Sequence, residues 1–370
     1  MTHARKPFLL TPLGALVAVA CVGIVAMAVW MAVNRNVPEE AAPDSGRAVP
    51  LDPNNADAVF QRGCAYLKAR QYDKALADFE RLAQQIDPDN RLGYASRKEY
   101  AEAYLGQGTA IRGEGRQLLK GAMNARRGSE GTLAKAKMQQ AVDLFTKAVR
   151  HDPTNALLYS RRGTCLLQLG QLDAAVDDLT KAIGFGTQEQ DLDLIYRGFA
   201  YVKTATRQGA DPAARNELLE KSKADYLAAR EKNPRNADAE YLLAECHVQL
   251  GDYQAAIGPY QSAIKKHPQW PDPWFSLRDA YFYQGNCFLL TGDLAKAAED
   301  FSRALDLTGD FIATPAETAK AMHALAAEFA KRKQLREANE CNEKAIGLAP
   351  DQAAKEEYRA AGKPWKADKP

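Results

Sequence analysis

Apolar residues recur at intervals of three and four positions along most of the chain after residue 55, a spacing that places them on one face of an α-helix. Few stretches show the alternation of apolar and polar residues that a half-buried β-strand requires. Within residues 161–183, Gly163, Gly170, Ala175 and Ala182 interrupt the leucines at regular steps. The pattern predicts an all-α protein whose small residues mark close approaches between helices.

The same pattern returns with a period of 34 residues. Residues of one kind that lie 34 positions apart are Ala141 and Ala175, Ala148 and Ala182, Tyr226 and Tyr260, and Ala229 and Ala263. A fixed period of this length, with small residues and an aromatic residue at set places, is typical of stacked helical hairpins.

These positions resemble the tetratricopeptide repeat (TPR). Its pattern fits the first repeat at Val59, Gly63, Tyr66, Ala75 and Phe79, and later repeats fit in the same register. Repeats two and four fit only when insertions are allowed. The resemblance implies a right-handed superhelical solenoid of about seven TPR helical hairpins over 51–350, followed by a capping helix and tail in 351–370.

The insertions predict hairpin extensions near 113–137 and 203–221. The first extension has six basic and two acidic residues, and Arg126 and Arg127 lie at its expected turn. Contact with an acidic partner or an anionic lipid is one interpretation, although a solvated hairpin is the more common use of such charges. Trp270 and Trp274, in a further insertion, are either an interaction hot spot or packing groups against a neighbouring repeat.

The N-terminal segment differs from the rest. After a short basic stretch at 1–8, residues 9–33 carry no charge and are long enough for a transmembrane helix, and 34–50 resemble a flexible linker. A cleaved signal peptide and a lipoprotein signal are the alternatives. The flanking basic residues favour an array on the extracytoplasmic side, periplasmic in a bacterium, although cysteines without a disulfide pattern fit an oxidising compartment poorly.

Charge and motifs indicate no chemistry. The 49 basic and 47 acidic residues give a net charge of +2, which does not favour nucleic acid. The five histidines show no metal-ligand spacing, and the nucleophile and phosphate-binding motifs are absent. We therefore expect no enzyme activity, no catalytic residue, no metal, no cofactor and no small-molecule substrate.

The TPR resemblance implies that the first helix of each repeat lines a concave groove. The side chains expected to face it, exposed and dispensable for packing, are Asp57, Phe60, Leu67, Ile195, Phe199, Asp238, Tyr241, Glu245, Asp279, Phe282 and Asn286. Aromatic residues flanked by acids favour a protein or peptide partner that is apolar and carries basic residues. The basic and asparagine set with which some TPR proteins hold a C-terminal carboxylate is absent from the positions considered.

Together these expectations describe a membrane-anchored TPR scaffold that mediates protein–protein interaction or complex assembly. A regulatory subunit that gates an enzyme in the same membrane complex is the alternative. A further alternative, which applies to both, is that the protein's own segments fill the groove in place of a partner.

Overall fold

The computed structural model describes residues 55–82, 84, 98–125, 128–207, 211–266, 277–307 and 315–365. Every regular element in these ranges is helical, as the apolar periodicity predicts. None of the helices described there is long and apolar enough to cross a membrane. The expected transmembrane helix at 9–33 and the linker at 34–50 lie outside the described residues.

The described residues form two compact units that divide between Tyr201 and Val202, within α8. The helices of the N-terminal unit are α2 (Ala56–Lys68), α3 (Tyr72–Arg81), α4 (Lys98–Ala125), α5 (Gly128–His151), α6 (Ala156–Leu169), α7 (Leu172–Phe185) and α8 (Gln190–Ala205). Those of the C-terminal unit are α9 (Pro212–Lys232), α10 (Ala237–Leu250), α11 (Tyr253–Lys266), α12 (Leu277–Thr291), α13 (Leu294–Asp306), α14 (Pro315–Lys331), α15 (Leu335–Leu348), α16 (Gln352–Gly362) and the short 3₁₀-helix η4 (Lys363–Trp365).

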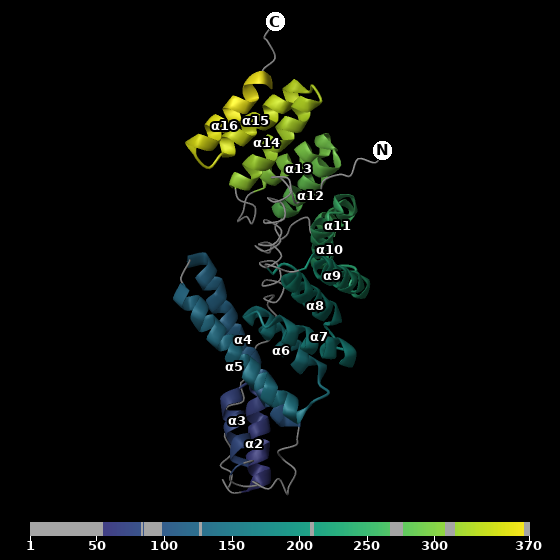
Figure 1. Cartoon of the computed structure of the whole chain (residues 1–370). Helices are drawn as coiled ribbons and strands as arrows, with labels where there is room; N and C mark the ends of the chain where they lie inside the picture. Colours follow the sequence, from purple (N-terminus) through teal and green to yellow (C-terminus); the bar gives the residue numbers. More distant parts are fainter. Residues whose placement is uncertain are drawn as a thin grey trace. The chain divides into compact units, whose positions relative to one another are not determined.

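Consecutive helices pack in pairs, for example α6 with α7 and α12 with α13 (Figure 1). The side chains of Asn55, Asn155 and Asn236 accept hydrogen bonds at the N-termini of α2, α6 and α10. Gly170 ends α6 at a φ of 77°, a left-handed conformation that glycine adopts without strain. Asparagine and glycine thus begin and end the helices at repeating positions.

Glycines lie where the two helices of a repeat come closest. A Cβ atom on Gly63 would stand 2.5 Å from Cε1 of Phe79, and one on Gly285 would stand 2.9 Å from Cδ1 of Phe301. In the repeat between them, a Cβ atom on Gly163 would lie 3.0 Å from Cγ of Leu179. The space that a side chain would need is therefore already filled by the facing helix.

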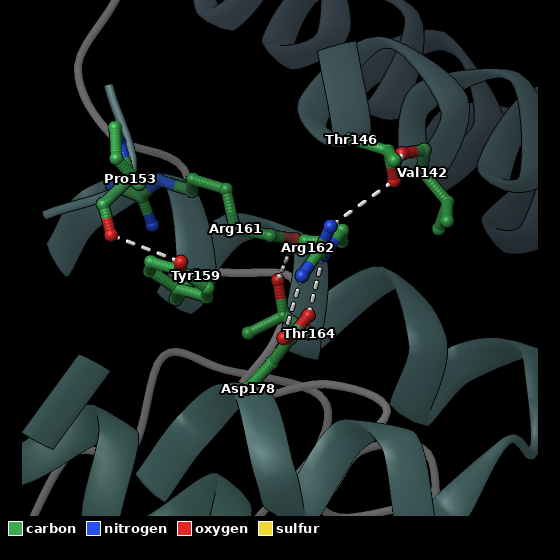
Figure 2. A network of polar contacts seen from close by, with 8 residues as sticks. All are labelled: Val142, Thr146, Pro153, Tyr159, Arg161, Arg162, Thr164 and Asp178. Atoms are coloured by element: carbon green, nitrogen blue, oxygen red, sulfur yellow. Dashed lines mark hydrogen bonds and ion pairs between the residues drawn. The ribbon is translucent and has the colours of Figure 1, made fainter. Parts of the chain in front are cut away.

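A partly buried ion pair joins the two helices in two of the repeats. Arg162 on α6 donates from Nε to Oδ2 of Asp178 on α7 at 2.6 Å and from Nη2 to Oδ1 at 2.8 Å, as Figure 2 shows. Its Nη1 also donates to Thr146 on α5 at 3.2 Å, which links this repeat to the preceding hairpin. Arg62 and Asp78 form the same bidentate pair in the first repeat, at 2.8 and 2.6 Å.

The α12–α13 repeat keeps the aspartate but lacks the arginine. Asp300 lies fifteen positions after Gly285, as Asp178 does after Gly163, but Gln284 stands at the arginine position. Both side chains are buried, and neither Oδ2 of Asp300 nor Nε2 of Gln284 has a hydrogen-bond partner among the described residues. They line a pocket of about 240 Å³. Burial raises the pKa of the Asp300 carboxyl to about 7, although Arg303 opposes the shift.

The second repeat has the longest helices of the N-terminal unit. α4 has 28 residues and α5 has 24, whereas α6 and α7 have 14 each. The two helices lie side by side (Figure 1), and the chain passes from one to the other at 126–127, inside the stretch expected to turn. Arg126 and Arg127 themselves, like Trp270 and Trp274, lie outside the described residues.

We predict that Gly163→Leu lowers the free energy of unfolding by at least about 1–3 kcal/mol, because the new side chain overpacks the contact with Leu179. Denaturant unfolding measures the change. Gly184→Leu is the matched control, because a Cβ atom there meets nothing within 4 Å, and it should be neutral or stabilising by up to about 1 kcal/mol. Equal effects at the two positions would contradict the packing described.

We predict that Asp300→Asn stabilises the protein at neutral pH but not in acid. Because the folded state raises the pKa of this acid from 3.8 to about 7, its favourable contribution is complete below pH 3.8 and is lost as the pH rises towards 7. At pH 8 the variant should gain about 1–3 kcal/mol, and below pH 4 it should match the wild type. Denaturant unfolding across this pH range measures both. Asp178→Asn, which breaks the pair with Arg162, should instead destabilise at pH 8; a gain there would contradict the comparison.

Candidate partner-binding surface

Side chains from α4 and α6 meet in a polar cluster within the N-terminal unit. Arg112 on α4 donates from Nη1 to Oγ1 of Thr164 on α6 at 2.9 Å. The Thr164 hydroxyl in turn donates to the backbone carbonyl of Arg161 at 2.9 Å. Nη1 of Arg161 forms an ion pair with Oε2 of Glu189 at 3.1 Å, just before α8 begins. The cluster therefore joins the first helices of two repeats to the start of a third.

A second set of contacts connects α6 directly to α8. Ser160 donates to Oδ1 of Asp193 at 2.6 Å, and the Thr187 hydroxyl donates to the other carboxylate oxygen. Burial raises the pKa of Asp193 to about 6, although both hydrogen bonds and the nearby Arg161 favour the ionised form. This carboxylate is thus held by hydroxyl groups in a site where its charge is poorly solvated.

The arginines on α4 have no such compensation. Arg112 is buried and Arg116, one turn further along α4, is half-buried. Burial lowers the pKa of Arg112 and lowers that of Arg116 to about 10. The charge of Arg161 lowers both pKa values further and that of Arg112 lowers the pKa of Arg116, whereas Glu189 raises the pKa of Arg112. By contrast, the hydrogen bonds to Asp178 raise the pKa of Arg162. Arg112, Arg116 and Arg161 are called the arginine cluster below.

In the C-terminal unit, the acidic and aromatic residues of α10 and α12 are packed inside the fold. The Tyr260 hydroxyl on α11 donates to Oε1 of Glu245 on α10, and the rings of Tyr241 and Tyr260 meet edge to face with centroids 5.6 Å apart. The ring of Phe282 on α12 lies 5.7 Å from that of Phe301 on α13. These contacts hold each first helix against the second helix of its own repeat.

The expectation that the groove residues are exposed is wrong for eight of the eleven. Those eight are buried: Ile195, Phe199, Asp238, Tyr241, Glu245, Asp279, Phe282 and Asn286. Asp57 is exposed, and Phe60 and Leu67 are half-buried. The physical reason is visible at Tyr241 and Phe282, whose rings contact aromatic side chains of their own repeat, so that they contribute to packing. The part that any of the eleven plays in binding a partner stays a prediction.

Sequence reasoning counted Arg116 among the basic residues of the first extension but did not single out Arg112 or Arg161. Arg112 follows Gly108 by four positions, as Leu67 follows Gly63, so the repeat register places both residues on the same face of a first helix. The insertion in the second repeat obscured this register, and Arg116 was placed on a hairpin that either contacts an acidic partner or anionic lipid or is solvated. Extending the register from Gly108 along α4 would have found both residues.

No group of three or more His, Cys, Asp or Glu side chains among the described residues could hold a metal ion. Cys165 and Cys246 are buried free thiols, and burial raises their pKa values to about 11 and about 12. Such thiols remain protonated near neutral pH and behave as small packing groups.

Comparisons with known proteins identify the repeats. Family models described as "Tetratricopeptide repeat" match residues 46–77, 144–177, 206–271 and 278–311. "Tetratricopeptide repeat protein 16" of Homo sapiens is 26% identical over 188 residues, which cover 40% of this chain and 22% of that protein. "DnaJ homolog subfamily C member 3" of Homo sapiens is 27% identical over 181 residues, covering 48% of this chain and 34% of that protein.

Among solved structures, YrrB, described as "a TPR protein with an unusual peptide-binding site", is 21% identical with a TM-score of 0.45, and the match covers 58% of this chain and 97% of that one. The chain thus spans about a quarter to a third of the length of the two curated relatives above.

Proposed function

We propose that this chain, which carries tetratricopeptide repeats, is a scaffold that holds a protein or peptide partner on the first helices of its repeats. The observation that carries the proposal is the set of contacts between α4, α6 and the start of α8, which joins side chains of successive first helices. Stacked hairpins create extended surfaces of this kind, with each repeat contributing a few side chains.

An exposed apolar side chain on the same helices supports this assignment. Leu157, in the first turn of α6, retains 36% of its accessible surface, whereas Leu158 beside it is fully buried. Leu157 occupies the register position of Asp57 in the first repeat. An apolar group beside charged residues is the usual composition of a surface that binds a peptide.

The finer part of the proposal is that residues 9–33 anchor the array in a membrane, with 34–50 as a tether and the repeats on the extracytoplasmic side. It rests on the length of the uncharged segment and on the basic residues around it. In this arrangement the partner is captured close to the membrane surface.

We predict that a photo-crosslinking amino acid at Leu157 captures one defined protein in cells, because this position lies on the proposed binding surface. The matched control is Asp177, an exposed position on the second helix α7, which should give no discrete product. The captured protein, identified by mass spectrometry and purified, should bind the chain directly. Equal products at both positions, or none at either, would remove the support for this surface.

We predict that deleting residues 1–36 converts the protein from a membrane-bound form to one released by carbonate washing, because the deletion removes the proposed span. Circular dichroism should show that the truncated chain remains helical. The full chain, treated in parallel, should stay in the membrane pellet. Carbonate-resistant retention of the truncated chain would show that the anchor is assigned wrongly.

A further inference from the structure

One arginine of the cluster is buried and a second is half-buried, and neither pairs with a carboxylate among the described residues. Arg112 retains 5% of its accessible surface, and it donates a hydrogen bond to the neutral hydroxyl of Thr164. Arg116 makes no hydrogen bond or ion pair with any residue that the structure describes. A guanidinium that loses water without gaining an anion is costly, and buried charges in proteins are usually paired.

Two half-buried arginines of this unit, Arg62 and Arg162, show what a structural arginine looks like in this fold. Arg62 and Arg162 each form two hydrogen bonds to one aspartate across their own repeat. Arg112 and Arg116 instead lie four residues apart on α4, and the positive charge of Arg161 lowers the pKa of both. Their arrangement therefore works against stability unless an anion joins them.

The carboxylates near the cluster are already engaged. Glu189 is paired with Arg161, and Asp193 accepts hydrogen bonds from Ser160 and Thr187. Three guanidiniums thus stand near two carboxylates, and neither carboxylate contacts Arg112 or Arg116 through a hydrogen bond. The site has a local positive excess although the whole chain has a net charge of only +2.

The spacing of the two arginines indicates the form of the anion. Arg112 and Arg116 are four residues apart on one helix, a rise of about 6 Å along its axis. In an extended peptide, side chains two residues apart point to the same side and are separated by about 6.6–6.8 Å. Two acidic residues with one residue between them match this spacing, and arginine binds carboxylates through paired hydrogen bonds.

We propose that the arginine cluster binds an extended acidic peptide of the partner, with alternate carboxylates on Arg112 and Arg116. The proposal rests on the scaffold function above and gives the chemistry of the partner at this place. It reverses the expectation of a basic partner for the N-terminal unit. Arg161, held by Glu189, adds positive potential beside the two binding residues without being free to move away.

The test measures binding of a fluorescein-labelled glycine–serine dodecapeptide that contains one Glu-Ser-Glu sequence to the full chain in non-ionic detergent. Fluorescence anisotropy should show saturable binding that weakens as NaCl rises from 50 to 500 mM. A peptide of the same composition with two adjacent glutamates should bind at least fivefold more weakly. Equal affinities for the two peptides would overturn the proposed register.

Arg112→Gln combined with Arg116→Gln should weaken binding of the first peptide at least tenfold. The control combines Arg150→Gln with Lys135→Gln, two exposed positions on α5 that remove the same two charges, and it should change the affinity less than twofold. Unchanged binding in the arginine variant, or an equal loss in both variants, would overturn the proposal.

The melting temperature separates a binding role from a structural one. Removing two poorly compensated charges should leave the melting temperature of the arginine variant unchanged or raise it, whereas arginines needed for folding would lower it. If the double variant does not fold, Arg116→Gln alone, which loses no hydrogen bond, should still weaken peptide binding at least threefold. Wild-type binding by this single variant would contradict the proposal.

Competition with inorganic phosphate tests whether the site binds any small free anion. At 10 mM and constant ionic strength it should compete weakly with the Glu-Ser-Glu peptide; complete displacement would identify a simple anion site instead. The result of the peptide-binding experiment does not depend on the result of the crosslinking experiment at Leu157. If the peptide does not bind while crosslinking at Leu157 captures a protein, the scaffold stands and the arginine assignment is wrong.

Discussion

The array depends on two helices approaching so closely that the first has no room for a side chain at one position. At Gly63 the missing Cβ atom would lie 2.5 Å from the ring of Phe79, which is inside any normal contact distance. The aromatic ring gains buried surface and contacts that a larger spacing between helices would forfeit. A short repeat cannot bury its apolar face alone, so this contact within the repeat and the stacking of neighbouring repeats stabilise the array together.

The polar contacts between paired helices vary more from repeat to repeat than the glycine contacts described above. Two repeats join their helices with an arginine–aspartate pair, whereas the α12–α13 repeat keeps Asp300 opposite Gln284 and still forms the same helical pair. Buried ion pairs in proteins are often close to neutral in their net contribution because desolvation offsets attraction. The hairpin therefore tolerates the loss of the arginine, and the site retains a carboxyl group that titrates near neutral pH.

The sequence predicted the helices well and the site poorly. Helix positions follow from apolar spacing and from caps such as Asn155 and Gly170, which act over a few residues and can be read locally. The exposure of Tyr241 depends on the side chains opposite it. The ring that it contacts belongs to Tyr260 on another helix, so local sequence does not predict its burial. Arg112 could have been found from the repeat register, but its burial and its lack of a carboxylate arise from α6 and α8, which no local pattern encodes.

The unusual length of α4 changes what a repeat can present. In the α6 repeat, Gly170 ends the first helix seven residues after Gly163, and the position equivalent to Arg116 is Gln171, which already belongs to the turn. In α4 the helix continues through that position to Ala125, so Arg116 is carried on rigid backbone. The longer helix thus adds a charged side chain without replacing any side chain that the fold needs for its core. Insertions that lengthen a helix can therefore change which partner such an array binds, while the residues that pack its repeats stay the same.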